Sequence, residues 1–258
     1  MMQLITADVG TWVSSVVWPF LRISAMFAVS PILSARMVPV RVRLLLALAM
    51  ASLLAPLIPS ASGMEPMSAA GLLVSIHQVM IGLAMGFILQ LVFAALAIAG
   101  ESVALSMGLG FASMVDPQNG IQVPIVSSYY VIVATLLFLV LNGHLALFGV
   151  LADSFYSLPV GVDGIAREGL WQIVEWASRM FMGALLIALP ALTSMLQVNL
   201  AFGVITRAAP QLNIFAVGFP VTLLLGFVVL MLSVPNLTPR FTDLLTNAYQ
   251  LINHLTGN

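Results

Sequence analysis

Few side chains in this sequence could carry out chemistry, and the histidines are the first to consider. His77, His144 and His254 are its three histidines, and histidine is the side chain that ordinarily exchanges protons near neutral pH. The sequence contains no H-E-x-x-H, G-x-S-x-G, P-loop or G-x-G-x-x-G motif, and it has no cysteine. We therefore expect a protein that is not an enzyme and that needs no catalytic residue, cofactor or metal.

A set of serine, histidine and aspartate can still be named around one of these histidines. His144, in the run Asn142-Gly143-His144, precedes Asp153 and Ser154 by about two and a half helical turns. That spacing places His144 and Asp153 on different helical faces, which disfavours a catalytic triad. A buried, hydrogen-bonded histidine at the end of a helix is the more ordinary interpretation.

The most informative segment runs from Ser106 to Val123. Its three glycines, together with Asp116-Pro117 and Asn119-Gly120, mark turns and exclude a continuous helix. It is nevertheless rich in Met, Leu, Phe, Val and Ile, which is unusual for an exposed connection. Such a loop could obstruct a passage and still move aside, or it could be a packed, re-entrant loop without a gating role. The residues alone slightly favour the packed loop.

Glu101 precedes this loop and is the first charge after the uncharged stretch 66–100. An ionisable group in an apolar environment is costly and usually has a partner or neighbouring water. Glu101 is therefore either a helix-end residue at a membrane interface, or a polar contact that anchors the loop or lines a pore.

Composition indicates what must hold these residues in place. Of 258 residues, 61% are hydrophobic and only 7% are charged, so lipid or other apolar protein must cover much of the surface. The basic residues are all arginine, and the formal net charge is −1, which leaves no basic stripe for nucleic acid.

Uncharged stretches predict the membrane elements, since a crossing takes roughly 20 helical residues. Besides these uncharged stretches, an apolar segment at about 9–33 is interrupted by Pro19, Arg22 and Pro31. We expect an all-α integral membrane protein with long and broken helices, six apolar segments, and a single membrane-embedded domain over 1–258. The uncharged stretches are Leu44–Met64, Pro66–Gly100, Pro124–Ala152, Met180–Thr206 and Ala208–Pro239.

Several segments do not fit simple crossings. At ~1.5 Å per residue, a helix over 67–100 would reach ~50 Å against a ~30 Å hydrocarbon core, so it either breaks or extends past the bilayer within an assembly. Pro190 and Pro220 would each free a carbonyl inside a span, which is tolerated where the backbone is buried in protein or lines a cavity. The tail Arg240–Asn258 predicts a short interfacial or partner-packing helix.

Small residues predict where helices meet. Gly82-Leu-Ala-Met-Gly86 has the spacing that lets two helix backbones approach closely. We expect Gly82 and Gly86 to be helix-packing residues, and a functional hinge is the alternative.

Four passages resemble the FliR/SctT family of type III secretion export proteins. They are Pro31–Arg43, Glu101–Pro117, Leu141–Gly161 and Arg207–Pro220, and the last of these, Arg-Ala-Ala-Pro-Gln-Leu-Asn-Ile-Phe-Ala-Val-Gly-Phe-Pro, is the most specific. They follow the family's order and span most of the chain.

The resemblance implies a non-enzymatic subunit of the flagellar type III export gate in the bacterial inner membrane. A single copy would assemble with several copies of FliP and FliQ into a helical, pore-forming complex, joined by FlhB, FlhA and the basal body. Unfolded flagellar proteins would pass through that pore. The resemblance also implies that much of the subunit lies above the conventional bilayer plane.

The resemblance further implies roles for individual residues. A plug loop would occupy about 106–123, with Phe111, Met114, Val115 and Asp116 narrowing the closed passage. The full set expected for the plug is Met107, Gly108, Gly110, Phe111, Met114, Val115, Asp116 and Pro117. Structural or subunit-contact roles fall on Glu101, Arg207, Pro210, Gln211, Asn213, Gly218 and Pro220, where Gln211 and Asn213 would satisfy backbone groups around Pro210.

Two other classes of function compete with this one. A stand-alone small-molecule transporter should show paired broken helices and matched internal repeats, and neither is apparent in the sequence. An intramembrane enzyme would need converging polar groups, which the sequence does not offer.

Overall fold

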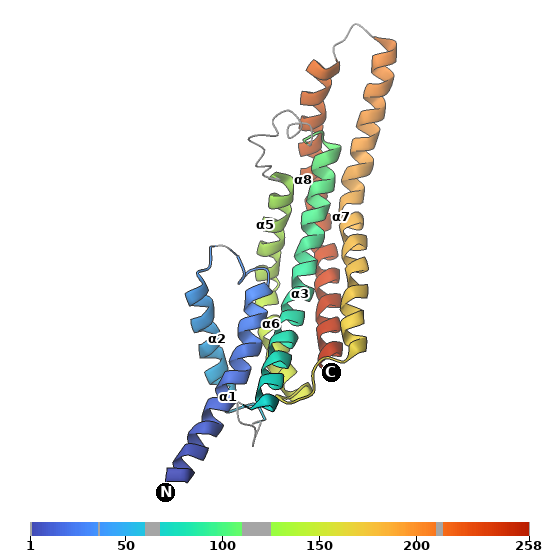
Figure 1. Cartoon of the computed structure of the whole chain (residues 1–258). Coiled ribbons are helices and arrows are strands. Elements are labelled where there is room, and N and C mark those ends of the chain that lie inside the picture. Colours follow the sequence, from blue (N-terminus) through green and yellow to red (C-terminus); the bar gives the residue numbers. More distant parts are fainter. Residues whose placement is uncertain (1, 36, 60–67, 110–124, 210–213, 258) are drawn as a thin grey trace. The chain divides into compact units, whose positions relative to one another are not determined.

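Helices make up the regular structure of the chain, as the sequence predicts (Figure 1). The computed structural model describes residues 2–35, 37–59, 68–109, 125–209 and 214–257, with side chains described outside 2–14 and 214–217. Among these residues there are seven helices and no strand. The helices are α1 (Met2–Val29), α2 (Val40–Leu54), α3 (Ala69–Ser106), α5 (Ile125–Val140), α6 (Gly143–Ser157), α7 (Arg167–Ala208) and α8 (Ile214–Thr256).

Three helices of the described chain are long and apolar enough to cross a membrane, namely α3, α7 and most of α8. Counting the bent pair α5 and α6 as one span gives four within the described residues, fewer than the six apolar segments predicted from the sequence. Lack of charge does not make a helix continuous. The uncharged stretch 124–152 bends by 66° between α5 and α6, where Asn142 adopts a left-handed backbone with φ of 55°.

α3 is continuous over 38 residues, so the predicted long span does not break at Gly82 or Gly86. α7 and α8 are longer still and continue through their internal prolines, Pro190 in α7 and Pro220, Pro235 and Pro239 in α8.

The tail beyond Arg240 is the last part of α8 and not a separate interfacial helix, which corrects the prediction. Phe241, Leu244, Leu245 and Ile252 are buried inside the chain, so its apolar face already packs against the protein itself.

The chain divides into two compact units. The first consists of Met1–Leu91, Leu139–Ala177 and Leu245–Asn258, and the second of Val92–Phe138 and Ser178–Leu244. In the first unit, α1 buries Trp18, Ile23, Met26 and Phe27. In the second, the ring of Phe93 on α3 packs edge-on against Phe138 of α5 and Phe241 of α8, with centroids 5.8 Å apart in both pairs.

Candidate functional site at the loop junction and a buried arginine

The end of α3 fixes where the predicted plug loop begins. The Leu109 amide donates to the Ala104 carbonyl at 3.1 Å, and the Gly108 amide donates to the Leu105 carbonyl at 3.1 Å. Gly108 has a φ of 84°, in the left-handed region that favours glycine. Together these features form a Schellman motif, which satisfies the last carbonyls of the helix and turns the chain away from its axis.

Met107, the first residue expected for the plug, is fully buried in the second unit. It packs against Gly226 of α8, where an added Cβ would lie 2.6 Å from the Met107 Cε and 2.7 Å from its Cγ. A side chain at position 226 would therefore displace Met107. Because Gly226 has no side chain, Met107 can pack directly against α8, and this contact fixes the α3 end of the loop.

The α5 flank of the loop is held in the same unit. The Ser127 hydroxyl donates to the Ala97 carbonyl of α3 at 2.9 Å. Gly100 lies so close to α5 that an added Cβ would be 2.6 Å from the Ser127 Cα. Both ends of the loop are thus anchored, whereas Gly110, Phe111, Met114, Val115, Asp116 and Pro117 lie outside the described residues.

Some of the residues expected to have structural or subunit-contact roles are described by the structure, and the others are not. Glu101 is half-buried in the last turns of α3, and Arg207 is exposed in the last turn of α7. Gly218 is buried in α8, where its carbonyl accepts a hydrogen bond from the Thr222 hydroxyl at 3.0 Å, and Pro220 is exposed. Pro210, Gln211 and Asn213 lie outside the described residues.

Gly82 and Gly86 lie at the contact between α3 and α1 in the first unit. A Cβ at Gly82 would collide with the main-chain oxygen of Arg22, and one at Gly86 would lie 2.7 Å from the Met26 oxygen. The two helix backbones can approach this closely only because both positions lack a side chain.

A buried arginine next to this contact was missed by the reasoning from sequence. Arg22 is 0% exposed, and its Nε donates to the Gln78 Oε1 at 2.8 Å. Its Nη1 donates to the Ser154 carbonyl at 2.7 Å, and its Nη2 donates to the Leu158 carbonyl at 2.8 Å. The guanidinium also stacks over the Phe155 ring, 4.2 Å from its centroid. Arg22 therefore ties α1 to α3 and to the end of α6.

Neutral acceptors hold this charge, and their position explains how they can. The Ser154 and Leu158 carbonyls belong to the C-terminal end of α6, which carries the negative end of the helix dipole. A guanidinium spreads its charge over five donors, so several carbonyls can share it. The sequence signal was available, because Arg22 is the one charged residue in the apolar segment 9–33.

The Ser, His and Asp set is not assembled into a catalytic site. The Ser154 hydroxyl donates to the Leu151 carbonyl at 2.7 Å and accepts from Arg22 at 3.1 Å, and Asp153 is exposed. His144 is half-buried near the start of α6, and its Nδ1 has no hydrogen-bond partner among the described residues.

Comparison with known proteins places the chain in a family. Residues 13–248 match the model of the family described as bacterial export proteins, family 1. Flagellar biosynthetic protein FliR of Escherichia coli (strain K12) is 37% identical over 252 residues, covering 98% of this chain and 96% of that protein.

Two other proteins of the same name give similar results. FliR of Pectobacterium carotovorum subsp. carotovorum is 38% identical over 95% of this chain and 94% of that protein. FliR of Bacillus subtilis (strain 168) is 30% identical over 82% of each chain. The chain therefore belongs to the bacterial export protein family 1, as one of its FliR-type members.

Proposed function

We propose that this chain is the FliR subunit of the flagellar type III export gate. Family membership and its membrane-length helices make it a membrane component of the flagellar export apparatus in the bacterial inner membrane. In the proposal, one copy assembles with several copies of FliP and FliQ into the pore for unfolded flagellar proteins. FlhB, FlhA and the basal body join that complex.

The observation that carries the assembly proposal is the apolar surface the chain leaves uncovered. In their most apolar windows, α7 is 33% buried and α8 only 22% buried, compared with 67% for α3. Neighbouring helices or lipid must cover the rest. FliP and FliQ would provide neighbouring helices in the assembled gate.

Helix length supports a position partly above the conventional bilayer plane. α3 carries no charge from Ala69 to Gly100, a length of ~48 Å, against a hydrocarbon core of ~30 Å. The excess apolar length would be exposed to water unless other protein subunits surround it. The long helices α3, α7 and α8 run through both compact units, which supports a single membrane-embedded domain over 1–258.

The plug proposal is supported by the anchored flanks of the loop. Met107 and Ser127 are held by packing and hydrogen bonding at its two ends, so a change in the loop need not disturb the helices. In the closed gate, Phe111, Met114, Val115 and Asp116 would narrow the passage.

Shortening the loop between Gly108 and Gly120 should therefore make the assembled gate leaky to ions and small molecules while the complex still forms. Conductance of the purified complex in planar bilayers measures the leak, and size-exclusion chromatography monitors assembly. Unchanged conductance in a fully assembled complex would place the closure elsewhere.

Co-expression with FliP and FliQ from the same source, followed by native mass spectrometry of the detergent-extracted complex, tests the assembly. We expect a stable hetero-oligomer with one copy of this chain. A monodisperse homo-oligomer indifferent to both partners would refute the gate proposal and support a stand-alone transporter.

A further inference from the structure

Prolines interrupt the backbone hydrogen bonding of α7 and α8 in the second unit. Pro190 lies inside α7, and Pro235 and Pro239 lie inside α8. Because proline has no amide hydrogen, the carbonyls of Leu186, Met231 and Pro235 lack their usual helical donors. Both helices nevertheless continue through these positions. Each helix is therefore held less firmly at its prolines than along the rest of its length.

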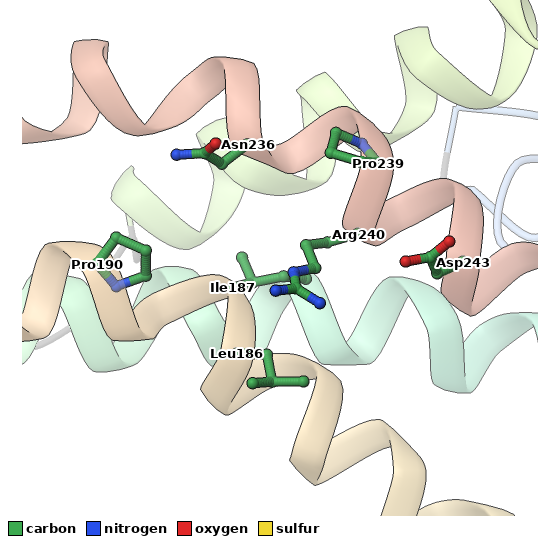
Figure 2. Close-up of a pocket in the computed structure, with 7 residues that line it drawn as sticks. All are labelled: Leu186, Ile187, Pro190, Asn236, Pro239, Arg240 and Asp243. Atoms are coloured by element: carbon green, nitrogen blue, oxygen red, sulfur yellow. The ribbon is translucent and has the colours of Figure 1, made fainter.

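A pocket between α7 and α8 brings prolines of the two helices to the same level (Figure 2). It has a volume of about 420 Å³, and its lining includes Pro190 of α7 together with Asn236 and Pro239 of α8. Leu186, whose carbonyl lacks its helical donor, lines it as well. Sharp bends in helices occur mostly at proline. Open space beside the prolines gives both helices room to bend there.

Hydroxyl side chains weaken α7 further, just beyond Pro190. The Thr193 hydroxyl donates to the Leu189 carbonyl at 2.9 Å, and the Ser194 hydroxyl donates to the Pro190 carbonyl at 2.8 Å. Bonds of this kind, from a side chain to the preceding turn, compete with the helical amides and often bend helices. The turn after Pro190 is therefore the point at which α7 bends most easily.

Packing within the chain differs on the two sides of Pro190. Before it, Gly183 lies so close to α8 that an added Cβ would be 2.8 Å from both δ-carbons of Leu244. Beyond it, no described α7 residue after Met195 is buried, up to Ala208. Segments with few buried contacts open at a low cost in free energy. Residues 191–208 of α7 and 218–234 of α8, called the distal arm, can therefore move while the contact of Gly183 with Leu244 stays in place.

The distal arm contacts the start of the loop that follows α3. Gly226, in its α8 segment, packs against the buried Met107 at the end of α3. Gly226 precedes Pro235 by nine residues, a length of ~13.5 Å along the helix. A bend of about 20° at Pro235 would move Gly226 by ~4–5 Å, which is enough to break a van der Waals contact.

We propose that the three prolines form a hinge in α7 and α8 that opens the gate. Bending at this hinge withdraws Gly226 from Met107, and the loop that follows Met107 is then free to leave the passage. The continuous helices of this structure correspond to the closed gate. The inference rests on the proposed function, because it assigns to the hinge the opening of that same gate.

Stiffening the hinge tests the proposal in the chain assembled with FliP and FliQ. The triple variant Pro190→Ala, Pro235→Ala and Pro239→Ala supplies the three missing amides. Each restored hydrogen bond should lower the bent population several-fold, so export of flagellar proteins should fall at least about tenfold while native mass spectrometry still shows the complex. Leu189→Ala with Thr238→Ala is the matched control, since both exposed residues adjoin a proline and neither substitution adds an amide. Normal export by the triple variant would overturn the inference.

Adding Gly226→Val tests whether the hinge acts through Met107. The triple variant alone should keep the low resting conductance of the wild-type complex, because its loop stays in place. The valine displaces Met107 without any bend, so it should raise the conductance of the purified complex equally in the triple variant and in the wild-type background. A triple variant that suppressed this increase would show that the hinge does not act through this contact.

A distance measurement detects the bend itself. The sequence has no cysteine, so Ile132→Cys on α5 and Val204→Cys on the distal arm provide unique spin-label sites in this chain. Both positions are exposed and lie in the second unit. Val204 follows Pro190 by fourteen residues, or ~21 Å, so a bend of about 20° would move it by ~7 Å.

Pulsed electron paramagnetic resonance compares the resting complex with one in which a flagellar protein fused to a folded domain is stalled. We expect a second distance between the labels in the stalled wild-type complex, and its loss in the triple variant. Identical distances in the resting and stalled wild-type complexes would overturn the inference alone. Failure of the wild-type chain to assemble with FliP and FliQ would overturn the proposed function itself.

Discussion

Replacing Arg22 with Met should destabilise the first compact unit severely. The substitution removes a buried charge and leaves three acceptors without their donor, namely the Gln78 Oε1 and the carbonyls of Ser154 and Leu158. Each buried, unsatisfied acceptor costs ~1 kcal/mol or more. Loss of the stacking on Phe155 adds ~0.5–2 kcal/mol.

The expected total is ~3–5 kcal/mol, which is also the usual cost of breaking a buried charged network. For a chain of this size, ~1 kcal/mol shifts the melting temperature by ~2–4 °C, so a decrease of roughly 6–20 °C should follow. Circular dichroism of the detergent-extracted chain at 222 nm measures that shift. Arg22→Lys should fall between wild type and Arg22→Met, because one ammonium cannot reproduce the fork of donors.

Arg41→Met is the matched control, since Arg41 is exposed on α2 and its loss should change the melting temperature little. A melting temperature for Arg22→Met within a degree or two of the control would refute the reasoning. It would mean that the acceptors around Arg22 find other donors at no cost.

Glycine positions give two further predictions. Gly82→Leu should separate α3 from α1 and lower the level of the chain in membranes, measured on immunoblots. Gly149→Ala is the control, because a Cβ there would have nothing within 4 Å, and it should leave that level unchanged or raised. Equal levels for the two variants would contradict the close approach of α3 and α1. Gly226→Val should displace Met107 and increase ion conductance through the assembled complex. Adding Met107→Ala should reverse part of that increase, because the smaller side chain makes room for the valine. A double variant with the same conductance as Gly226→Val would show that this contact does not position the loop.

The sequence correctly predicted that α3 is a long apolar helix and that it ends near Gly108. Absence of charge over 66–100 indicated a long apolar helix, and α3 is one, over 38 residues. Gly108 was a turn signal, and it adopts the left-handed backbone that ends the helix. These features depend on local chemistry, so they can be predicted from neighbouring residues.

Features that depend on distant residues were missed or misplaced. Arg22 was treated as an interruption of a span, because its partners Gln78 and Ser154 lie 56 and 132 positions away in the sequence. The stretch 124–152 was treated as one span because it lacks charge, although the Asn142-Gly143 pair marks a turn there. The tail was separated from α8 because the uncharged stretch ends before Arg240, yet α8 continues through that charge to Thr256.

Two arginines in apolar helices lead to opposite conclusions, and the difference lies in their partners. Arg22 has its donors occupied by carbonyls and an amide of its own chain, so its role is complete within the subunit. Arg240 is exposed and lines a pocket with Asp243 and Leu186, and among the described residues no group accepts a hydrogen bond from it. The cost of isolating a charge from water applies to Arg22, which is fully buried, and not to the exposed Arg240. A buried arginine whose donors are bonded within the chain therefore indicates internal architecture, whereas an exposed arginine such as Arg240 has water available and needs no such partners.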